Sequence, residues 1–296
     1  MHERFQNILI PVDFSLNTEV AVCKAAELIE KEESSIYLLH AVPHFLFRNN
    51  RKYFTEAERK LKQWKESIED GLPNVHVSYR LPKGSVQKRI IEAARELRPD
   101  LIVIGKSTPH ARWSFFKTLM PAAVAETTNI PVLTAKPGAL HNKLKSVVVP
   151  ITEHIADNKL KTLESLCARG NVKIHLVTFV NGRNAPAEFS ASTLLQVYQW
   201  LKTRLHCPVE YSAIHGAHKD KALLNYAQKN GADLLLVNAK KETRLQWPNV
   251  HISDVVSPTS KYRYCPYNTT SILNRKTKTM KQHCANEEAK NTPQFV

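Results

Sequence analysis

Two residues whose types could serve ligand binding follow buried apolar runs in the first half of the chain. Asp13 comes after NILIPV at residues 7–12, and Gly105 comes after DLIVI at residues 100–104. A carboxylate there could hydrogen-bond a ribose or a base, and it could equally cap the helix that follows it. A glycine lets backbone N–H groups approach a phosphate closely. Both residues could therefore contact a ligand, and the two roles of Asp13 are compatible.

Cationic side chains surround the segment after Gly105, and together they could bind an anion without a glycine-rich loop. The set comprises Lys83, Arg89, Lys106, His110, Arg112 and Lys117. Ordinary solvated loop residues are the alternative interpretation, and we favour it.

Other catalytic and metal-binding patterns are missing or misplaced. The stretch from His215 to His218 reads HGAH and resembles the HxGH motif of nucleotidyltransferases, but that motif must follow the first strand. There is no Walker loop, no GxSxG elbow and no CxxC pair. The five cysteines lie too far apart in sequence to indicate a disulfide framework or a thiolate zinc site. We assign no catalytic residue and no metal ligand.

Apolar runs alternate with amphipathic helical stretches over residues 5–137. Buried strands are predicted for the Ile- and Val-rich runs at 7–12, 36–42, 100–104 and 130–135. The alternating run VHVSYRL at 75–81 predicts a strand nearer a sheet edge. Helices are predicted over about 18–32, over 55–70, from Gly84-Ser85 onward and over 118–128. This alternation predicts a parallel sheet covered on both faces, with ligands at the carboxyl ends of its strands.

The second half of the chain repeats the first. NILIPVD at 7–13 matches SVVVPIT at 146–152, IYLLHAV at 36–42 matches IHLVTFV at 174–180, and residues 85–106 match 218–239 without a gap. The offset falls from 139 to 133 residues, which is the length of a domain. We predict a first domain over 1–138, a linker over 139–145, a second domain over 146–274 and a disordered basic tail over 275–296. Thr152 and Asn238 replace Asp13 and Gly105 in the second copy.

The chain is basic, with a formal net charge of +15. Residues 1–140 carry +4, residues 141–274 carry +8 and the tail carries +3. Such a surface attracts polyanions, but no nucleic-acid-binding motif accompanies it, so a solvated basic face is the favoured interpretation. No stretch approaches the roughly 18 apolar residues of a membrane span, and no signal peptide is visible. We expect a cytoplasmic protein with no membrane partner.

Four phrases together resemble the universal stress protein domain: NILIPVDFS, IYLLHAV, RPDLIVIGK and VAETTNIPVLTAKPG. The resemblance covers residues 5–137, more weakly 145–240, and faintly 265–274. It implies an α/β chain of two tandem flavodoxin-like domains, of the adenine nucleotide alpha hydrolase-like type. Each domain is expected to have a five-stranded parallel sheet of order 3-2-1-4-5 with helices on both faces. It also implies that domains pair through their last strands, as a pseudo-dimer within the chain or as a homodimer.

The resemblance also assigns site residues in the first domain. Nucleotide-binding members place adenosine against the end of strand one and the loop after strand two. Pro11, Val12, Asp13 and Val42 match these positions, which we call the adenosine half. Gly105, followed by Lys106, matches the first glycine of the phosphate loop after strand four.

The remainder of that loop departs from the family pattern G-x2-G-x9-G-[ST]. Thr108 stands where the second glycine belongs. The final Gly-Ser falls on Thr118-Leu119 when counted forward, or on Ala122-Ala123 when counted back from the following helix. The second copy keeps no glycine after Gly231. The phosphate loop is therefore predicted to be degenerate in both domains.

These features predict a non-enzymatic protein of the universal stress type that acts in the stress response by binding a protein partner or a small ligand. One alternative is a sensor of ATP or AMP, or a weak ATPase, working through the first domain. The second alternative is a basic module associated with nucleic acid, which the missing motifs make the weaker choice.

Overall fold

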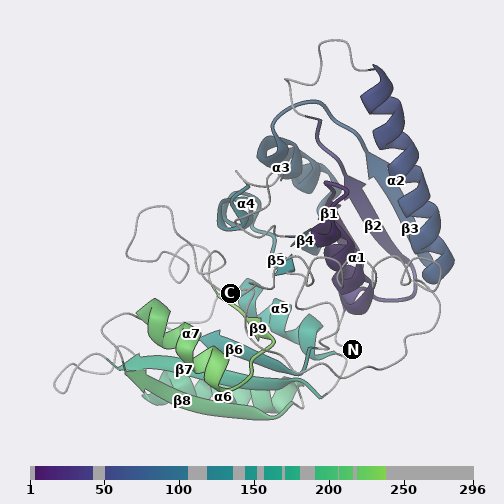
Figure 1. Ribbon diagram of the computed structural model, residues 1–296. Coiled ribbons are helices and arrows are strands. Elements are labelled where there is room, and N and C mark those ends of the chain that lie inside the picture. Colours follow the sequence, from purple (N-terminus) through teal and green to yellow (C-terminus); the bar gives the residue numbers. More distant parts are fainter. Residues whose placement is uncertain are drawn as a thin grey trace, which may run out of the picture.

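The computed structural model describes residues 4–42, 51–105, 119–135, 144–151, 157–168, 171–180, 191–205, 207–215 and 219–237. These residues form two α/β domains that follow one another along the chain (Figure 1). The first contains β1 (Asn7–Pro11), α1 (Leu16–Leu28), β2 (Ser34–Leu39), α2 (Arg51–Gly71), β3 (Val75–Arg80), α3 (Val86–Leu97), β4 (Leu101–Gly105), α4 (Pro121–Thr128) and β5 (Val132–Ala135). Its strands are all parallel in the order β3-β2-β1-β4-β5, which confirms the predicted order for this domain.

The second domain repeats this plan with fewer described strands. It contains β6 (Ser146–Pro150), α5 (Asp157–Cys167), β7 (Lys173–Val180), α6 (Ala191–Leu205), β8 (Val209–His215), α7 (Lys219–Lys229) and β9 (Leu234–Leu235). The parallel order β8-β7-β6-β9 matches the first four strands of the predicted sheet. The expected fifth strand, the faint match over 265–274 and the tail over 275–296 lie outside the described residues.

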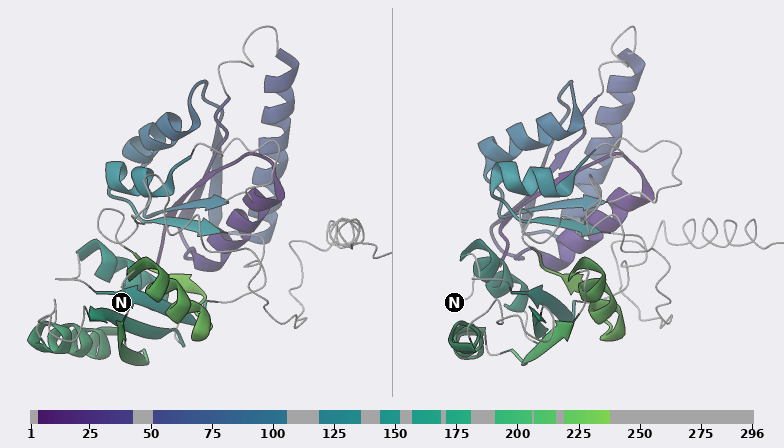
Figure 2. Two further views of the ribbon diagram at one scale, coloured as in Figure 1. Left: turned by 60° about the vertical axis from the view of Figure 1, so that its left-hand side comes forward. Right: turned by 90° about the vertical axis from the view of Figure 1, so that its left-hand side faces the viewer.

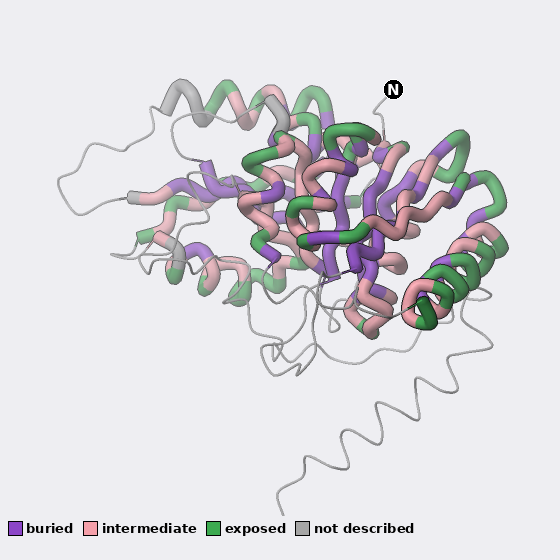
Figure 3. Tube along the Cα trace, turned by 90° about the horizontal axis from the view of Figure 1, so that it is seen from above, coloured by how far each residue is buried: buried purple, intermediate pink, exposed green. Residues whose placement is uncertain are grey.

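Alternating side chains of β1 explain why the first sheet is covered on both faces. Ile8 and Ile10 belong to one buried cluster with side chains of α1 and α2, whereas Leu9 belongs to another with side chains of α3 and α4. Figure 2 shows the helices on the two sides of the sheet, and Figure 3 shows the buried strands between them. Each fully buried aliphatic side chain stabilises the fold by roughly 1.5–3 kcal/mol. The sheet is therefore a rigid base for the loops at its carboxyl edge.

Two predictions about single elements have opposite outcomes. The alternating run at 75–81 forms β3, which lies at the sheet edge as predicted. The first helix was expected to reach residue 32, and this is wrong because it ends at Leu28. Ile29 adopts an extended conformation and forms a parallel bridge with Phe5, and the N–H of Glu30 donates to the Phe5 carbonyl at 2.8 Å. Tertiary pairing thus overrides the helical pattern.

The two domains touch through a few contacts near the linker. The backbone N–H of Leu144 donates to Oε1 of Glu27 at 3.3 Å, and Leu166 of α5 packs in the first domain's cluster. β5 is the edge strand of its sheet, and no described strand pairs with its outer side. Pairing of the domains through their last strands therefore stays a prediction. Within the described ranges, no helix is long and apolar enough to cross a membrane.

Candidate functional site

The adenosine half gathers at the carboxyl edge of the first sheet. Pro11 ends β1, Val12 follows it, and Val42 lies just beyond the end of β2. Gly105 ends β4, which is the neighbour of β1 on the side opposite β2. Lys106 lies outside the described residues. The structure therefore brings together the predicted residues that it describes.

Asp13 holds the turn that leads into the first helix. Its Oδ1 accepts hydrogen bonds from the backbone N–H of Ser15 at 3.0 Å and from the Thr18 hydroxyl at 2.6 Å, and the Ser15 hydroxyl also donates to it. The backbone N–H of Asp13 in turn donates to Thr18 Oγ1 at 3.1 Å. The predicted capping role is wrong, because Ser15 is the N-cap residue and, among the described residues, no backbone N–H of α1 donates to Asp13. No described residue donates to the second carboxylate oxygen, Oδ2.

Gly105 is required by packing. A Cβ placed on it would lie 2.0 Å from the carbonyl oxygen of Asn17 and 2.8 Å from the backbone N of Thr18. Real side chains do not approach backbone atoms so closely. The end of β4 can meet the first turn of α1 only because this position lacks a side chain.

Backbone groups of the two valines are already engaged within the protein. The N–H of Val12 donates to the Leu39 carbonyl at 2.8 Å. The N–H of Val42 donates to the Pro82 carbonyl at 2.9 Å, and its carbonyl accepts from the N–H of Gly84 at 2.8 Å. Both side chains are buried. These residues therefore extend the sheet, and neither offers a spare N–H to a ligand.

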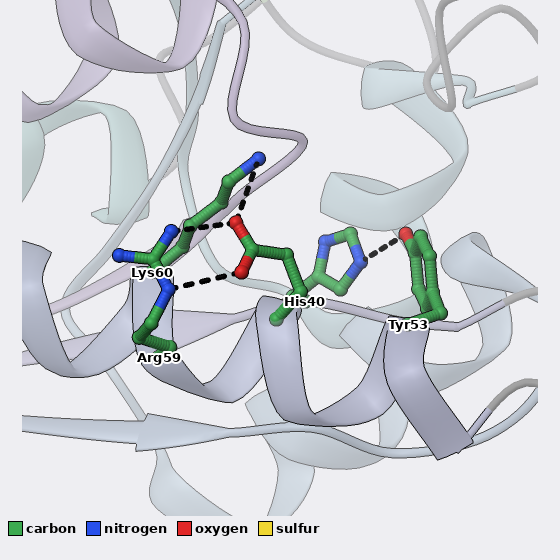
Figure 4. A network of polar contacts seen from close by, with 5 residues as sticks. His40, Tyr53, Arg59 and Lys60 are labelled. Carbon is green, nitrogen blue, oxygen red and sulfur yellow. Dashed lines mark hydrogen bonds and ion pairs between the residues drawn. The ribbon is translucent and has the colours of Figure 1, made fainter.

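His40, which the sequence analysis did not single out, is the buried polar centre of this edge. Its Nδ1 lies 2.7 Å from the Val12 carbonyl oxygen and its Nε2 lies 2.9 Å from the Tyr53 hydroxyl of α2 (Figure 4). Because a carbonyl only accepts, Nδ1 carries the proton and the neutral Nε2 accepts from Tyr53. Burial lowers the pKa of His40, which favours this neutral form. A histidine inside the apolar run IYLLHAV was the available signal.

Phe14 covers His40 from the loop between β1 and α1. The two ring centroids are 4.6 Å apart, and Trp64 of α2 meets Phe14 edge-on at 6.2 Å. Phe14 has a φ of 60°, a left-handed conformation that a bulky residue rarely adopts. Lys60 of α2 lies 5.5 Å from the Phe14 ring centroid and 3.7 Å from Glu56. The cluster of Phe14, His40, Tyr53 and Trp64, hereafter the aromatic cluster, fills the edge beside the adenosine half.

The predicted cationic set is described only in part. The Nε of Arg89 donates to the Lys83 carbonyl at 2.6 Å, and its Nη1 pairs with Glu92 at 2.6 Å. The ammonium of Lys83 lies 4.9 Å from the Phe54 ring centroid. Both cations contact protein groups, which agrees with ordinary surface roles. The other members, Lys106, His110, Arg112 and Lys117, lie outside the described residues.

The equivalent edge of the second domain carries a buried lysine. Lys159 of α5 donates to the carbonyl of Pro150, the counterpart of Pro11, at 2.7 Å. Thr152 and Asn238, the replacements for Asp13 and Gly105, lie outside the described residues. His215 ends β8, and the rest of the HGAH stretch is not described. Within the described ranges, no three His, Cys, Asp or Glu side chains are grouped to hold a metal ion.

The first domain is thus a doubly wound α/β domain with its candidate site at the carboxyl edge. Residues 4–136 match the model of the Universal stress protein family. Universal stress protein G of Escherichia coli O157:H7 is 22% identical to this chain over 142 residues, covering 45% of the chain and 99% of the relative. Over residues 4–136, the chain is therefore similar to the universal stress protein family.

Solved structures extend the fold comparison to both domains. A universal stress protein from Archaeoglobus fulgidus DSM 4304 is 18% identical with a TM-score of 0.58, covering 79% of this chain and 86% of its own. The cytoplasmic domain of a prokaryotic cation chloride cotransporter is 14% identical with a TM-score of 0.51, covering 80% of this chain and 98% of its own. These similarities show a shared two-domain fold.

Proposed function

We propose that this chain is a cytoplasmic, non-enzymatic universal stress-type protein that acts by binding a protein partner or a small ligand. In this proposal the phosphate loops of both domains are degenerate. The chain therefore keeps the scaffold of the family without turning over a nucleotide.

The observation that carries the proposal is the packing of Gly105 against α1. A Cβ on this residue would lie 2.0 Å from the Asn17 carbonyl oxygen, so the fold requires glycine whether or not a phosphate binds. Asp13 likewise has a structural task, since its Oδ1 holds Ser15 and Thr18. The residues that suggested a nucleotide site are thus explained by the scaffold itself.

The aromatic cluster supports the same conclusion. Phe14 and His40 occupy the edge beside Val12 with their own rings, 4.6 Å apart. A purine that inserted into the aromatic cluster would have to break this contact and the hydrogen bond from His40 to the Val12 carbonyl. Breaking them would lower the affinity of this edge for a purine.

Isothermal titration of the full chain with ATP and with AMP tests the proposal. We expect no binding in the micromolar range for either nucleotide. Micromolar binding of ATP would refute the degenerate-loop proposal, because that affinity would need the phosphate contacts that a degenerate loop lacks.

A nucleotide sensor working through the first domain, or a weak ATPase, is the second candidate. It is favoured by Oδ2 of Asp13, to which no described residue donates and which could accept from a ribose hydroxyl. This candidate predicts that ATP or AMP raises the melting temperature and that Asp13→Ala abolishes the rise. Asp70 is an exposed carboxylate on α2, so the Asp70→Ala variant is the control. Its melting temperature should still rise when nucleotide is added. The absence of any shift with wild-type protein rejects this candidate.

A further inference from the structure

Two cysteines of the second domain lie at the amino edge of its sheet. Cys167 is the last residue of α5, and helices that connect parallel strands end at that edge. Cys207 lies two residues before β8. Its neighbour Pro208 accepts a hydrogen bond from the N–H of Ile174, at the start of β7, at 2.8 Å. The topology therefore places the two cysteines together although 40 positions separate them in the sequence.

The two cysteines lie in the same part of the core. Both belong to one buried cluster with Val172 and Leu205. Only 4% of Cys167 and 7% of Cys207 is exposed. Both are free thiols.

The first domain shows that the scaffold does not need this thiol pair. At the repeat offset of 139 residues, Cys167 takes the place of Leu28, the last residue of α1. By the register of the two sheets, Cys207 takes the place of Val75, and Leu28 and Val75 pack in one apolar cluster of the first domain. A buried cysteine often serves merely as a small apolar side chain. Two cysteines in one buried cluster, where the first domain has Leu28 and Val75, add a chemistry that packing alone does not call for.

We propose that Cys167 and Cys207 form a modification site at which a peroxide oxidises the pair to an intramolecular disulfide. One thiolate attacks the O–O bond of hydrogen peroxide and becomes a sulfenic acid, and the second sulfur then attacks the first. The S–S bond forms as the S–O bond breaks. Two thiols and one peroxide give one disulfide and two waters, so the two electrons and two protons that the cysteines lose pass to the peroxide oxygens.

Burial and the neighbouring Cys207 raise the pKa of the Cys167 thiol. Since the thiolate is the nucleophile, oxidation through this sulfur is slow near neutral pH and accelerates as the pH rises. The site is therefore expected to respond to sustained rather than brief exposure to peroxide.

Peptide mapping of the full chain after hydrogen peroxide treatment tests the proposal. Remaining thiols are alkylated before proteolysis, and the peptides are weighed with and without dithiothreitol. We expect a linked pair of peptides containing Cys167 and Cys207, lighter by two hydrogens than the two reduced peptides together and separated by dithiothreitol. Its rate of formation should rise between about pH 7 and about pH 9.

A variant in which Cys23, Cys265 and Cys284 are replaced by serine isolates the pair. It should lose both remaining thiols to peroxide, whereas the further substitution Cys207→Ser should leave Cys167 open to alkylation. Circular dichroism shows whether each variant is folded. The peptide mapping of the wild-type chain tests the proposal even if a variant does not fold. The proposal is overturned if the pair stays alkylatable under peroxide, if either residue becomes a sulfinic acid, if each links to another cysteine, or if the link forms only in urea.

Discussion

Gly105 has a measurable structural task in the absence of any ligand. The missing side chain leaves room for the Asn17 carbonyl, which would lie 2.0 Å from a Cβ at this position. Because the obstructing atom belongs to backbone, Gly105→Ala must displace the end of β4 or the start of α1. We expect the free energy of unfolding to fall by about 1–3 kcal/mol or more, measured by urea denaturation without nucleotide.

Gly231 is the matched control for this substitution. It has a φ of +60° but nothing within 4 Å of a Cβ, so Gly231→Ala introduces backbone strain without a clash. This substitution should lower the free energy of unfolding by only the roughly 1–2 kcal/mol that a non-glycine residue costs in a left-handed conformation. If Gly105→Ala lowers the free energy of unfolding no more than Gly231→Ala does, close packing does not explain the glycine at position 105. A ligand-binding role for Gly105 would then be favoured.

Among the elements, the end of β2 and the start of α2 are joined by the His40–Tyr53 bond, which makes stability depend on pH. The pKa of His40 is lowered by burial in the folded protein from the usual value of about 6.5. The unfolded chain therefore binds the proton first, and the free energy of unfolding falls as the pH drops below about 6.5. It stops falling below the folded pKa, where both states are protonated.

His40→Gln is the variant that tests this link. It should lower stability at neutral pH by about 1–3 kcal/mol, because the Val12 carbonyl and the Tyr53 hydroxyl lose a buried partner. In this variant the free energy of unfolding should also decrease less as the pH drops below 6.5, as measured by chemical denaturation at a series of pH values. His76→Gln, at an exposed position in β3, removes a histidine without touching these bonds and should retain the wild-type fall. If the free energy of unfolding of His40→Gln depends on pH as steeply as that of the wild type, His40 is not the source of the pH dependence.

Elements were predictable wherever a local pattern decided them. The run at Asn7–Pro11 and the alternation over Val75–Arg80 each predicted a strand, and the structure has both. The end of α1 was not predictable, because Ile29 leaves the helix to pair with Phe5, 24 positions earlier. His40 was missed for a similar reason. Its burial among polar partners depends on Tyr53, which another element supplies.

At the scale of the molecule, the internal repeat predicted two domains. Contacts between segments that are distant in the chain could not be predicted from the sequence. Cys167 and Cys207 seemed unrelated in a chain with five scattered cysteines. They belong to one buried cluster because the end of α5 and the entry to β8 share one edge of the sheet, which only the assembled topology reveals. The candidate site was similarly half predictable. Residue types located Asp13 and Gly105, whereas their structural tasks emerged from the packing of α1.

The whole chain's net charge of +15 leads to the last prediction, which concerns nucleic acid. Several cations in the described domains are neutralised locally, as in the ion pairs of Arg80 with Glu96 at 2.5 Å and Lys173 with Glu210 at 2.6 Å. Because local pairing weakens a continuous basic surface, we expect no gel retardation of duplex DNA or single-stranded RNA at about 150 mM salt. Retardation at lower salt should weaken steeply as salt rises, and removing residues 275–296, which carry +3, should weaken it further. A complex that persists at about 150 mM salt would instead favour a nucleic-acid-associated module.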